Sequence, residues 1–168
     1  MPKEKVRPSE TVASDDEGGD PASPPCFMHE VDPDYVYGLP ADPAERIVTR
    51  KIHDGIGPYD GHRALVERLW PRGVSKTAAA LSSWEKDLAP SPELRRWYAH
   101  DTNRWPEFQD RYRKELAGRE KELDRLLDLA REDRLTLLFS SHETRCNSAV
   151  VLRAVLIERL QANQGEET

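Results

Sequence analysis

Three short runs of apolar residues, separated by segments with helical periodicity, set the pattern of this chain. Residues 46–52, 64–70 and 135–140 are rich in Ile, Val, Leu and Phe, which favours β-strands. The second and third runs are nearly continuous, as in strands that are buried on both faces. Pro71 lacks an N–H group and is expected to end the second strand, and Gly73 provides the turn that follows.

Apolar residues recur at helical spacing between the second and third strands and again after the third. Ser75 can cap the N-terminus of a short helix that runs to Leu88, with Trp84 near its middle. Ser91 can cap another helix that begins at Pro92, a residue favoured in the first turn. Three further stripes predict longer helices: Trp105, Phe108, Tyr112 and Leu116; Leu123, Leu126, Leu127 and Ala130; and Ala149, Leu152, Leu156 and Leu160.

The order of these elements predicts the fold class. Apolar strands flanked by helices indicate an α/β fold with a small, mainly parallel sheet. If the second and third strands are parallel, the chain leaves them at Trp70 and Ser140 on the same edge of the sheet. Ligands of such sheets bind outside the carboxyl ends of the strands, so this edge is the predicted site.

The domain boundaries follow from composition. Residues 1–45 form an acidic, Pro-rich arm that we expect to be disordered, residues 46–161 form the α/β domain, and residues 162–168 form a polar tail. Within the arm, residues 26–45 carry some apolar groups and could either dock on the domain or act as a loose linker. The arm holds three Lys or Arg against eleven Asp or Glu, a net charge of −8, and the remainder holds 22 against 20, a net of +2.

These properties narrow the functional classes. A nearly neutral domain argues against nucleic acid as the partner, because such proteins need a basic face. The two cysteines, Cys26 and Cys146, form no disulfide framework. No apolar run approaches the length of a membrane span, and the first residues lack the apolar core of a signal peptide, so a cytoplasmic location is expected.

The predicted site is basic and partly aromatic. We expect Arg72 and Lys76 to hold an anion, Trp70 and Trp84 to stack on a planar ligand, and Ser140 and Asn147 to orient it near the N-terminus of the last helix. These six residues and Arg68 are the candidate ligand-binding residues. Two alternatives stay open. Arg68 and Arg72 could pair with acids such as Glu67 or Asp87, and the tryptophans could simply cover the core.

Catalytic and metal chemistry receive weaker support. Ser140, Ser141, His142 and Cys146 lie in one loop, but proximity in sequence does not establish a nucleophile and its base, and no G-x-S-x-G motif is present. Cys26 and His29, together with His142 and Cys146, have the spacing of two chelating pairs. We assign no catalytic residue, metal ligand or cofactor from these patterns.

A longer set of motifs resembles the YeaO-like family, a domain of unknown function (number 488). The motifs are D-G-x-R-x-L-V-E-R-L-W-P-R-G-V-S-K at residues 60–76, W-x-K-D-L-A-P-S-x-E-L-R-R-W at 84–97, F-x-x-x-Y-x-x-E-L at 108–116, L-T-L-L-F-S at 135–140 and N-x-A-x-x-L at 147–152. The resemblance implies a compact cytoplasmic α/β domain without an established activity. Glu67 replaces the usual Asp, Ser148 replaces a frequent His, and His142 and Cys146 lie outside the pattern.

Three functional hypotheses result. The first is binding, with turnover left open, of a small anionic or nucleotide-like ligand at the basic edge of the sheet. The second is a non-enzymatic interaction or regulatory module that meets a protein partner through the acidic arm. The third is a metal-binding or redox protein. The sequence does not identify the ligand, the oligomeric state or whether any catalysis occurs.

Overall fold

The structure, a computed structural model, describes residues 40–166. The predicted arm, residues 1–45, therefore lies outside the described residues except for residues 40–45. Helix α3 (Pro43–Arg46) is the first described element and leads directly into the sheet. No helix between residues 40 and 166 is long and apolar enough to cross a membrane.

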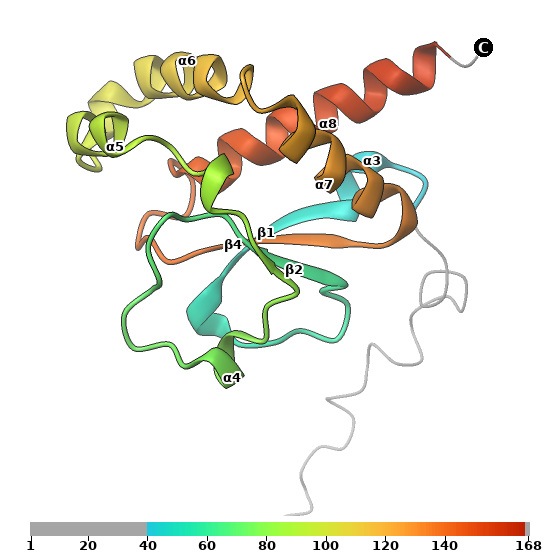
Figure 1. Ribbon diagram of the computed structural model, residues 1–168, viewed down its shortest axis with the longest axis horizontal. Helices are drawn as coiled ribbons and strands as arrows, with labels where there is room; N and C mark the ends of the chain where they lie inside the picture. Colours follow the sequence, from blue (N-terminus) through green and yellow to red (C-terminus); the bar gives the residue numbers. More distant parts are fainter. Residues whose placement is uncertain (1–39, 167–168) are drawn as a thin grey trace, which may run out of the picture. The chain divides into compact units, whose positions relative to one another are not determined.

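A parallel sheet of four strands forms the centre of the domain (Figure 1). Its strands are β1 (Ile47–Lys51), β2 (His62–Leu65), β3 (Ser83–Trp84) and β4 (Leu135–Phe139), in the spatial order β1-β4-β2-β3. The register pairs Leu137 of β4 with Thr49 on one side and with Ala64 on the other. The predicted α/β fold with a small, parallel sheet is thus confirmed, and all strands have their carboxyl ends at one edge.

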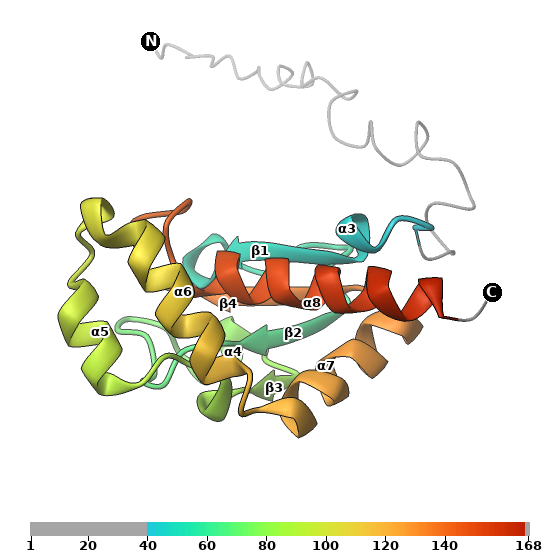
Figure 2. The ribbon, with the colours of Figure 1, turned by 90° about the horizontal axis from the view of Figure 1, so that it is seen from above.

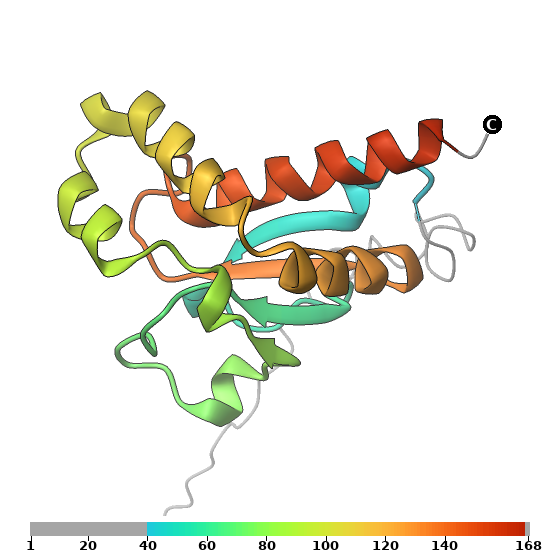
Figure 3. The ribbon, with the colours of Figure 1, turned by 45° about the horizontal axis from the view of Figure 1, so that its top comes forward.

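Helices cover the two faces of the sheet unequally. On one face lie α6 (Trp105–Leu116), α7 (Glu120–Glu132) and α8 (Ser148–Gly165), and α5 (Pro92–Tyr98) lies beyond the strand ends (Figures 2 and 3). Of the elements within residues 40–166, the other face carries α4 (Lys76–Ala79) and the connections around it. Three short 3₁₀ turns complete the described elements: η2 (Ile52–Asp54), η3 (Lys86–Leu88) and η4 (Thr102–Arg104). Helix α8 includes the first part of the predicted polar tail.

The core is divided by the sheet. Leu137 belongs to the larger cluster, beneath the helical layer, whereas its neighbour Leu138 belongs to a smaller cluster with Leu65 and Ile52 on the other face. Successive side chains of a strand point to opposite faces, so both clusters are built from the same strand. This accounts for the complete burial of β4 and for its continuous apolar sequence.

The second strand is shorter than predicted. We expected it to run to Trp70, but β2 ends at Leu65. Val66 still donates its N–H to the carbonyl of Leu138 at 3.2 Å. Beyond that point the ladder cannot continue, because the N–H of Ser140 donates to a carboxylate oxygen of Glu67 at 2.8 Å instead of to a backbone carbonyl. Residues 66–70 therefore form an irregular loop at the edge of the sheet.

The helix predicted from Ser75 to Leu88 is also wrong in its length. Ser75 caps the helix, with its hydroxyl accepting the N–H of Ala78 at 3.0 Å, but α4 ends at Ala79. Trp84 lies instead in the two-residue strand β3. The edge of β2 offers unpaired backbone N–H and C=O groups, so this segment joins the sheet as a strand. There Glu85 donates its N–H to the carbonyl of Leu65 at 2.7 Å.

The remaining helices agree with the sequence pattern. The hydroxyl of Ser91 accepts the N–H of Leu94 at 3.2 Å, and Pro92 opens α5 as predicted. The leucine stripe of α7 is buried in the larger cluster, as is the stripe of α6 except for Trp105, which is partly buried and packs against it. The helical layer thus forms where its apolar periodicity predicts it.

Candidate functional site

A pocket with a volume of about 1010 Å³ opens at the carboxyl edge of the sheet. Three segments form its walls: the loop after β2, the loop after β4 that leads into α8, and α5, which lie together at one end of the sheet in Figures 1 and 3. The pocket is lined by residues 67–72, 89, 90, 92, 95, 96, 98, 100, 108, 140–143, 147 and 148. The two strand exits therefore converge, as the parallel pairing of β2 with β4 requires.

Glu67 joins the two strand exits. Its carboxylate accepts the backbone N–H of Ser140 at 2.8 Å and the hydroxyl of Ser140 at 2.6 Å. Its own carbonyl accepts the indole N–H of Trp84 at 2.7 Å. Because both carboxylate oxygens are engaged, Glu67 positions the pocket wall and is not an ion-pair partner of its arginine neighbours.

Four arginines line the pocket: Arg68, Arg72, Arg95 and Arg96. Within residues 40–166, none of the ion pairs involves any of these four side chains. The Nε atom of Arg68 is buried without a hydrogen-bond partner there. A buried donor without an acceptor costs about 1–3 kcal/mol. The predicted alternative, pairing of Arg68 or Arg72 with Glu67 or Asp87, does not occur in the structure.

The second carboxylate of the pocket is also engaged by the backbone. Glu143 accepts the N–H groups of Arg145 at 2.8 Å and Cys146 at 3.3 Å through one oxygen. It therefore stabilises the turn that leads into α8. With Glu67 and Glu143 held in this way, four guanidinium groups face two carboxylates, and the excess charge of the pocket is positive.

Asn147 caps α8 at the rim of the pocket. Its side-chain carbonyl accepts the N–H of Val150 at 3.2 Å, and its amide donates to the carbonyl of Glu143 at 2.8 Å. These two bonds make Asn147 chiefly a helix cap. The helix that it caps is 18 residues long, so the partial positive charge of its N-terminus adds to that of the arginines.

The predicted aromatic residues are divided between the pocket and the core. Trp70 lines the pocket and packs edge-on against Trp84, with ring centroids 5.2 Å apart. The indole N–H of Trp70 donates to the carbonyl of Val74 at 2.6 Å, which closes the loop. Trp84 lies behind it against the smaller core cluster, and neither Trp84 nor Lys76 is among the described residues that line the pocket.

The sequence interpretation missed one wall of the pocket. Arg95 and Arg96, with Tyr98 and Phe108 beneath them, come from the helical segment rather than from a strand exit. Tyr98 stacks on Phe108 at 4.3 Å, and its hydroxyl donates to the carbonyl of Cys146 at 2.8 Å. Burial raises the pKa of Tyr98 to about 12, so it remains a neutral donor. The sequence signal for this wall is the pair of adjacent arginines on α5, which lies next to the buried residues Leu94 and Tyr98.

The loop after β4 does not provide an activated thiol. Burial, followed by the nearby charge of Glu143, raises the pKa of the Cys146 thiol above its usual value. A nucleophilic cysteine needs the opposite shift. His142 lines the pocket, whereas Cys146 does not, and residues 40–166 contain no cluster of three or more potential metal-ligating His, Cys, Asp or Glu side chains. Cys26 and His29 lie outside the described residues.

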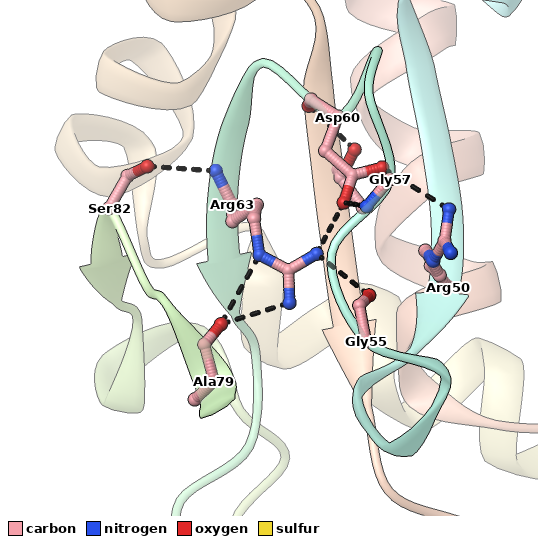
Figure 4. Close-up of polar contacts among 8 residues, drawn as sticks. Arg50, Gly55, Gly57, Asp60, Arg63, Ala79 and Ser82 are labelled. Atoms are coloured by element: carbon pink, nitrogen blue, oxygen red, sulfur yellow. Dashed lines mark hydrogen bonds and ion pairs between the residues drawn. The ribbon is translucent and has the colours of Figure 1, made fainter. Parts of the chain in front are cut away.

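A separate polar network stabilises the opposite face of the sheet (Figure 4). The buried guanidinium of Arg63 pairs with the buried carboxylate of Asp60 and also donates to the carbonyls of Ala79, at 2.9 Å, and Gly55, at 3.3 Å. Asp60 additionally accepts the N–H of Gly57 at 2.8 Å. These bonds join the β1–β2 connection to α4. Because every nitrogen of the Arg63 guanidinium has a hydrogen-bond partner, we infer that the network has a structural role.

Comparisons with known proteins place these features in context. A family model described as the inactive DUF488-N3 subclade matches residues 46–168. The chain is 42% identical over 106 residues to the uncharacterized protein YeaO of Escherichia coli (strain K12), which covers 63% of this chain and 92% of YeaO. It is 45% identical over 71 residues to the uncharacterized protein Rv3073c of Mycobacterium tuberculosis (strain H37Rv), which covers 42% of this chain and 60% of that protein. No solved structure matches.

Proposed function

This chain belongs to the YeaO-like DUF488 family, and we propose that its domain binds a small anionic or nucleotide-like ligand in the pocket at the carboxyl edge of the sheet. One observation carries the proposal: four arginine side chains from two walls line the pocket without forming an ion pair within residues 40–166. Guanidinium groups bind phosphate and carboxylate with paired hydrogen bonds. The volume suits a ligand of nucleotide size.

We propose binding without turnover. The family model that matches this chain is described as an inactive subclade. The chemistry of the pocket agrees with that description, because the thiol next to it has a raised pKa and both carboxylates are held by the backbone. A thiol with a raised pKa is poorly suited to act as a nucleophile.

Isothermal titration calorimetry with adenosine 5′-monophosphate and with inorganic phosphate tests the proposal. We expect both probes to bind the full chain and Arg72→Gln to weaken binding by roughly tenfold or more, because a charge-assisted hydrogen bond contributes about 1.5–3 kcal/mol. Arg72 is exposed, so the substitution should leave the free energy of unfolding nearly unchanged.

Arg145→Gln is the matched control. Arg145 lies in the loop after β4 and is exposed, but it does not line the pocket, so the variant removes the same charge from the same edge of the domain. Its affinity should remain close to that of the unsubstituted chain. Equal losses in the two variants would indicate a diffuse charge effect, and the absence of binding heat for both probes would reject the proposal.

A further inference from the structure

The turn after α5 holds two consecutive residues with a left-handed backbone. Ala99 has φ of 45° and His100 has φ of 59°. Glycine suits such positions best, because the Cβ atom of other residues then crowds the following carbonyl. A single left-handed residue commonly ends a helix, and Ala99 serves that purpose for α5. The helix end therefore does not account for the second one, His100.

Backbone and side-chain bonds hold this turn in place from both sides. Ala99 donates its N–H to the carbonyl of Arg95 at 3.0 Å, and Asp101 donates its N–H to the carbonyl of Tyr98 at 2.8 Å. The hydroxyl of Tyr98 in turn donates to the carbonyl of Cys146 at 2.8 Å. A strained backbone persists only where its surroundings determine it, and such strain clusters at sites that contact ligands. The strain at His100 therefore indicates a role for its side chain.

His100 lines the pocket of the proposed function. It is exposed there, together with the two arginines of α5, and its imidazole ring is tilted by 56° against the ring of Tyr98, with centroids 6.2 Å apart. Within residues 40–166 its ring nitrogens have no hydrogen-bond partner, whereas Nε2 of His62 contacts the hydroxyl of Ser83 at 2.8 Å. An imidazole carries an N–H donor in its neutral and in its protonated form, so His100 can donate to an anion in either form.

From the backbone strain, the position at the pocket and the unpartnered ring nitrogens, we infer that His100 is a ligand-binding residue whose imidazole donates a hydrogen bond to the anionic group of the ligand. The inference rests on the proposed function and adds a donor of a different kind to the four arginines of the pocket. The left-handed backbone places this ring at the pocket. Replacement of His100 by glycine should therefore relieve strain and weaken binding at the same time.

Three substitutions in the full chain separate the imidazole from the strain. His100→Gly removes both. His100→Ala removes the ring and keeps a left-handed alanine, which the chain already tolerates at Ala80 and Ala99. Ala99→Gly is the matched control, because it relieves strain in the same turn at a position that does not line the pocket.

Isothermal titration calorimetry with adenosine 5′-monophosphate and with inorganic phosphate measures the contribution of the ring. We expect His100→Gly and His100→Ala each to bind both probes about threefold to tenfold more weakly, as the loss of one hydrogen bond predicts. Ala99→Gly should bind both probes as tightly as the unsubstituted chain does.

Thermal unfolding provides a second readout. His100→Gly and Ala99→Gly should each raise the melting temperature by about 2–4 °C, and His100→Ala should change it by less than about 1 °C. A purely structural residue would not combine higher stability with weaker binding in His100→Gly.

The outcomes distinguish this inference from the proposed function. Unchanged affinities in both His100 variants, while the unsubstituted chain binds both probes, would overturn the role of His100 and leave anion binding intact. An equal loss of affinity in Ala99→Gly would overturn it too, because the rigidity of the turn would then be responsible. A loss for the nucleotide alone would place the ring against the nucleoside and refute donation to the anion. Failure of both probes to bind the unsubstituted chain would reject the proposed function and this inference with it.

Discussion

Arginine side chains occupy two contrasting environments in this domain. Arg63 is 3% exposed, and its guanidinium is satisfied by Asp60 and by backbone carbonyls. Arg72 and Arg96 are exposed at the pocket and form no ion pair within residues 40–166. The first arrangement stabilises a fold, because a buried charge without its partner is costly. The second leaves charge available to a ligand.

Removal of the acid from the buried pair should be strongly destabilising. We expect Asp60→Ala to lower the free energy of unfolding by about 3–5 kcal/mol, because it leaves the Arg63 guanidinium buried without its counter-charge. Urea unfolding followed by circular dichroism measures the change. Asp128→Ala breaks an exposed pair with Arg131 and should cost less than about 1 kcal/mol. Similar losses in the two variants would show that Asp60 has no special structural role.

For single residues, helix caps are predictable from the sequence, whereas the direction in which a helix side chain points is not. Ser75 and Ser91 were identified as caps because a cap depends only on its own residue and the next three. The lining positions of Arg68 and Arg72 followed from a strand exit. Arg95 escaped notice because the rotation of α5 relative to the sheet depends on packing between distant segments.

Two helices of the domain end on an alanine with positive φ. Ala80 follows α4 with φ of 44°, and Ala99 follows α5 with φ of 45°. In the left-handed region the Cβ atom of an L-residue approaches the following carbonyl, at a cost of about 1–2 kcal/mol. Glycine usually occupies this position because it lacks that atom. Both helix ends therefore hold local strain beside functional or connecting loops.

Relief of that strain should stabilise the protein. We expect Ala99→Gly to raise the free energy of unfolding by about 0.5–1 kcal/mol, since the relief exceeds the added flexibility of glycine in the unfolded chain. The comparison is Ala117→Gly at the end of α6, where φ is −62° and glycine offers no relief, so the variant should be destabilised. Thermal unfolding measures both. A lower melting temperature for Ala99→Gly would contradict this explanation.

The sequence predicts helices well where the apolar periodicity extends over several turns. It predicts short strands poorly, because contacts with distant segments determine whether they form. The stripes of α6, α7 and α8 extend over several turns and were found. The apolar run after Leu65 does not continue the strand: Val66 is buried in the larger cluster and Trp70 packs against the smaller one, but Leu69 is exposed. The strand at Trp84 is two residues long and forms only because β2 offers an edge.

Ion pairs join the helices of the helical layer, whereas the four arginines of the pocket form no ion pair within residues 40–166. Glu158 of α8 bonds with Arg113 of α6 at 2.9 Å, and Glu120 of α7 bonds with Arg159 of α8 at 2.6 Å. The hydrogen bond from Arg113 lowers the pKa of Glu158, and that from Arg159 lowers the pKa of Glu120. This asymmetry concentrates positive charge at the carboxyl edge of the sheet although the domain as a whole is nearly neutral.

The most direct test of anion binding observes the guanidinium groups themselves. In ¹⁵N-labelled protein, two-dimensional NMR resolves the Nε–H signals of arginine side chains, and substitution assigns them. On addition of adenosine 5′-monophosphate, we predict that the signal of Arg68 shifts together with that of Arg72, because both side chains line the proposed binding pocket. Signals of Arg131 and Arg145 should stay in place. Unchanged signals from Arg68 and Arg72 at saturating concentrations, or uniform shifts of all arginines, would contradict the proposed site.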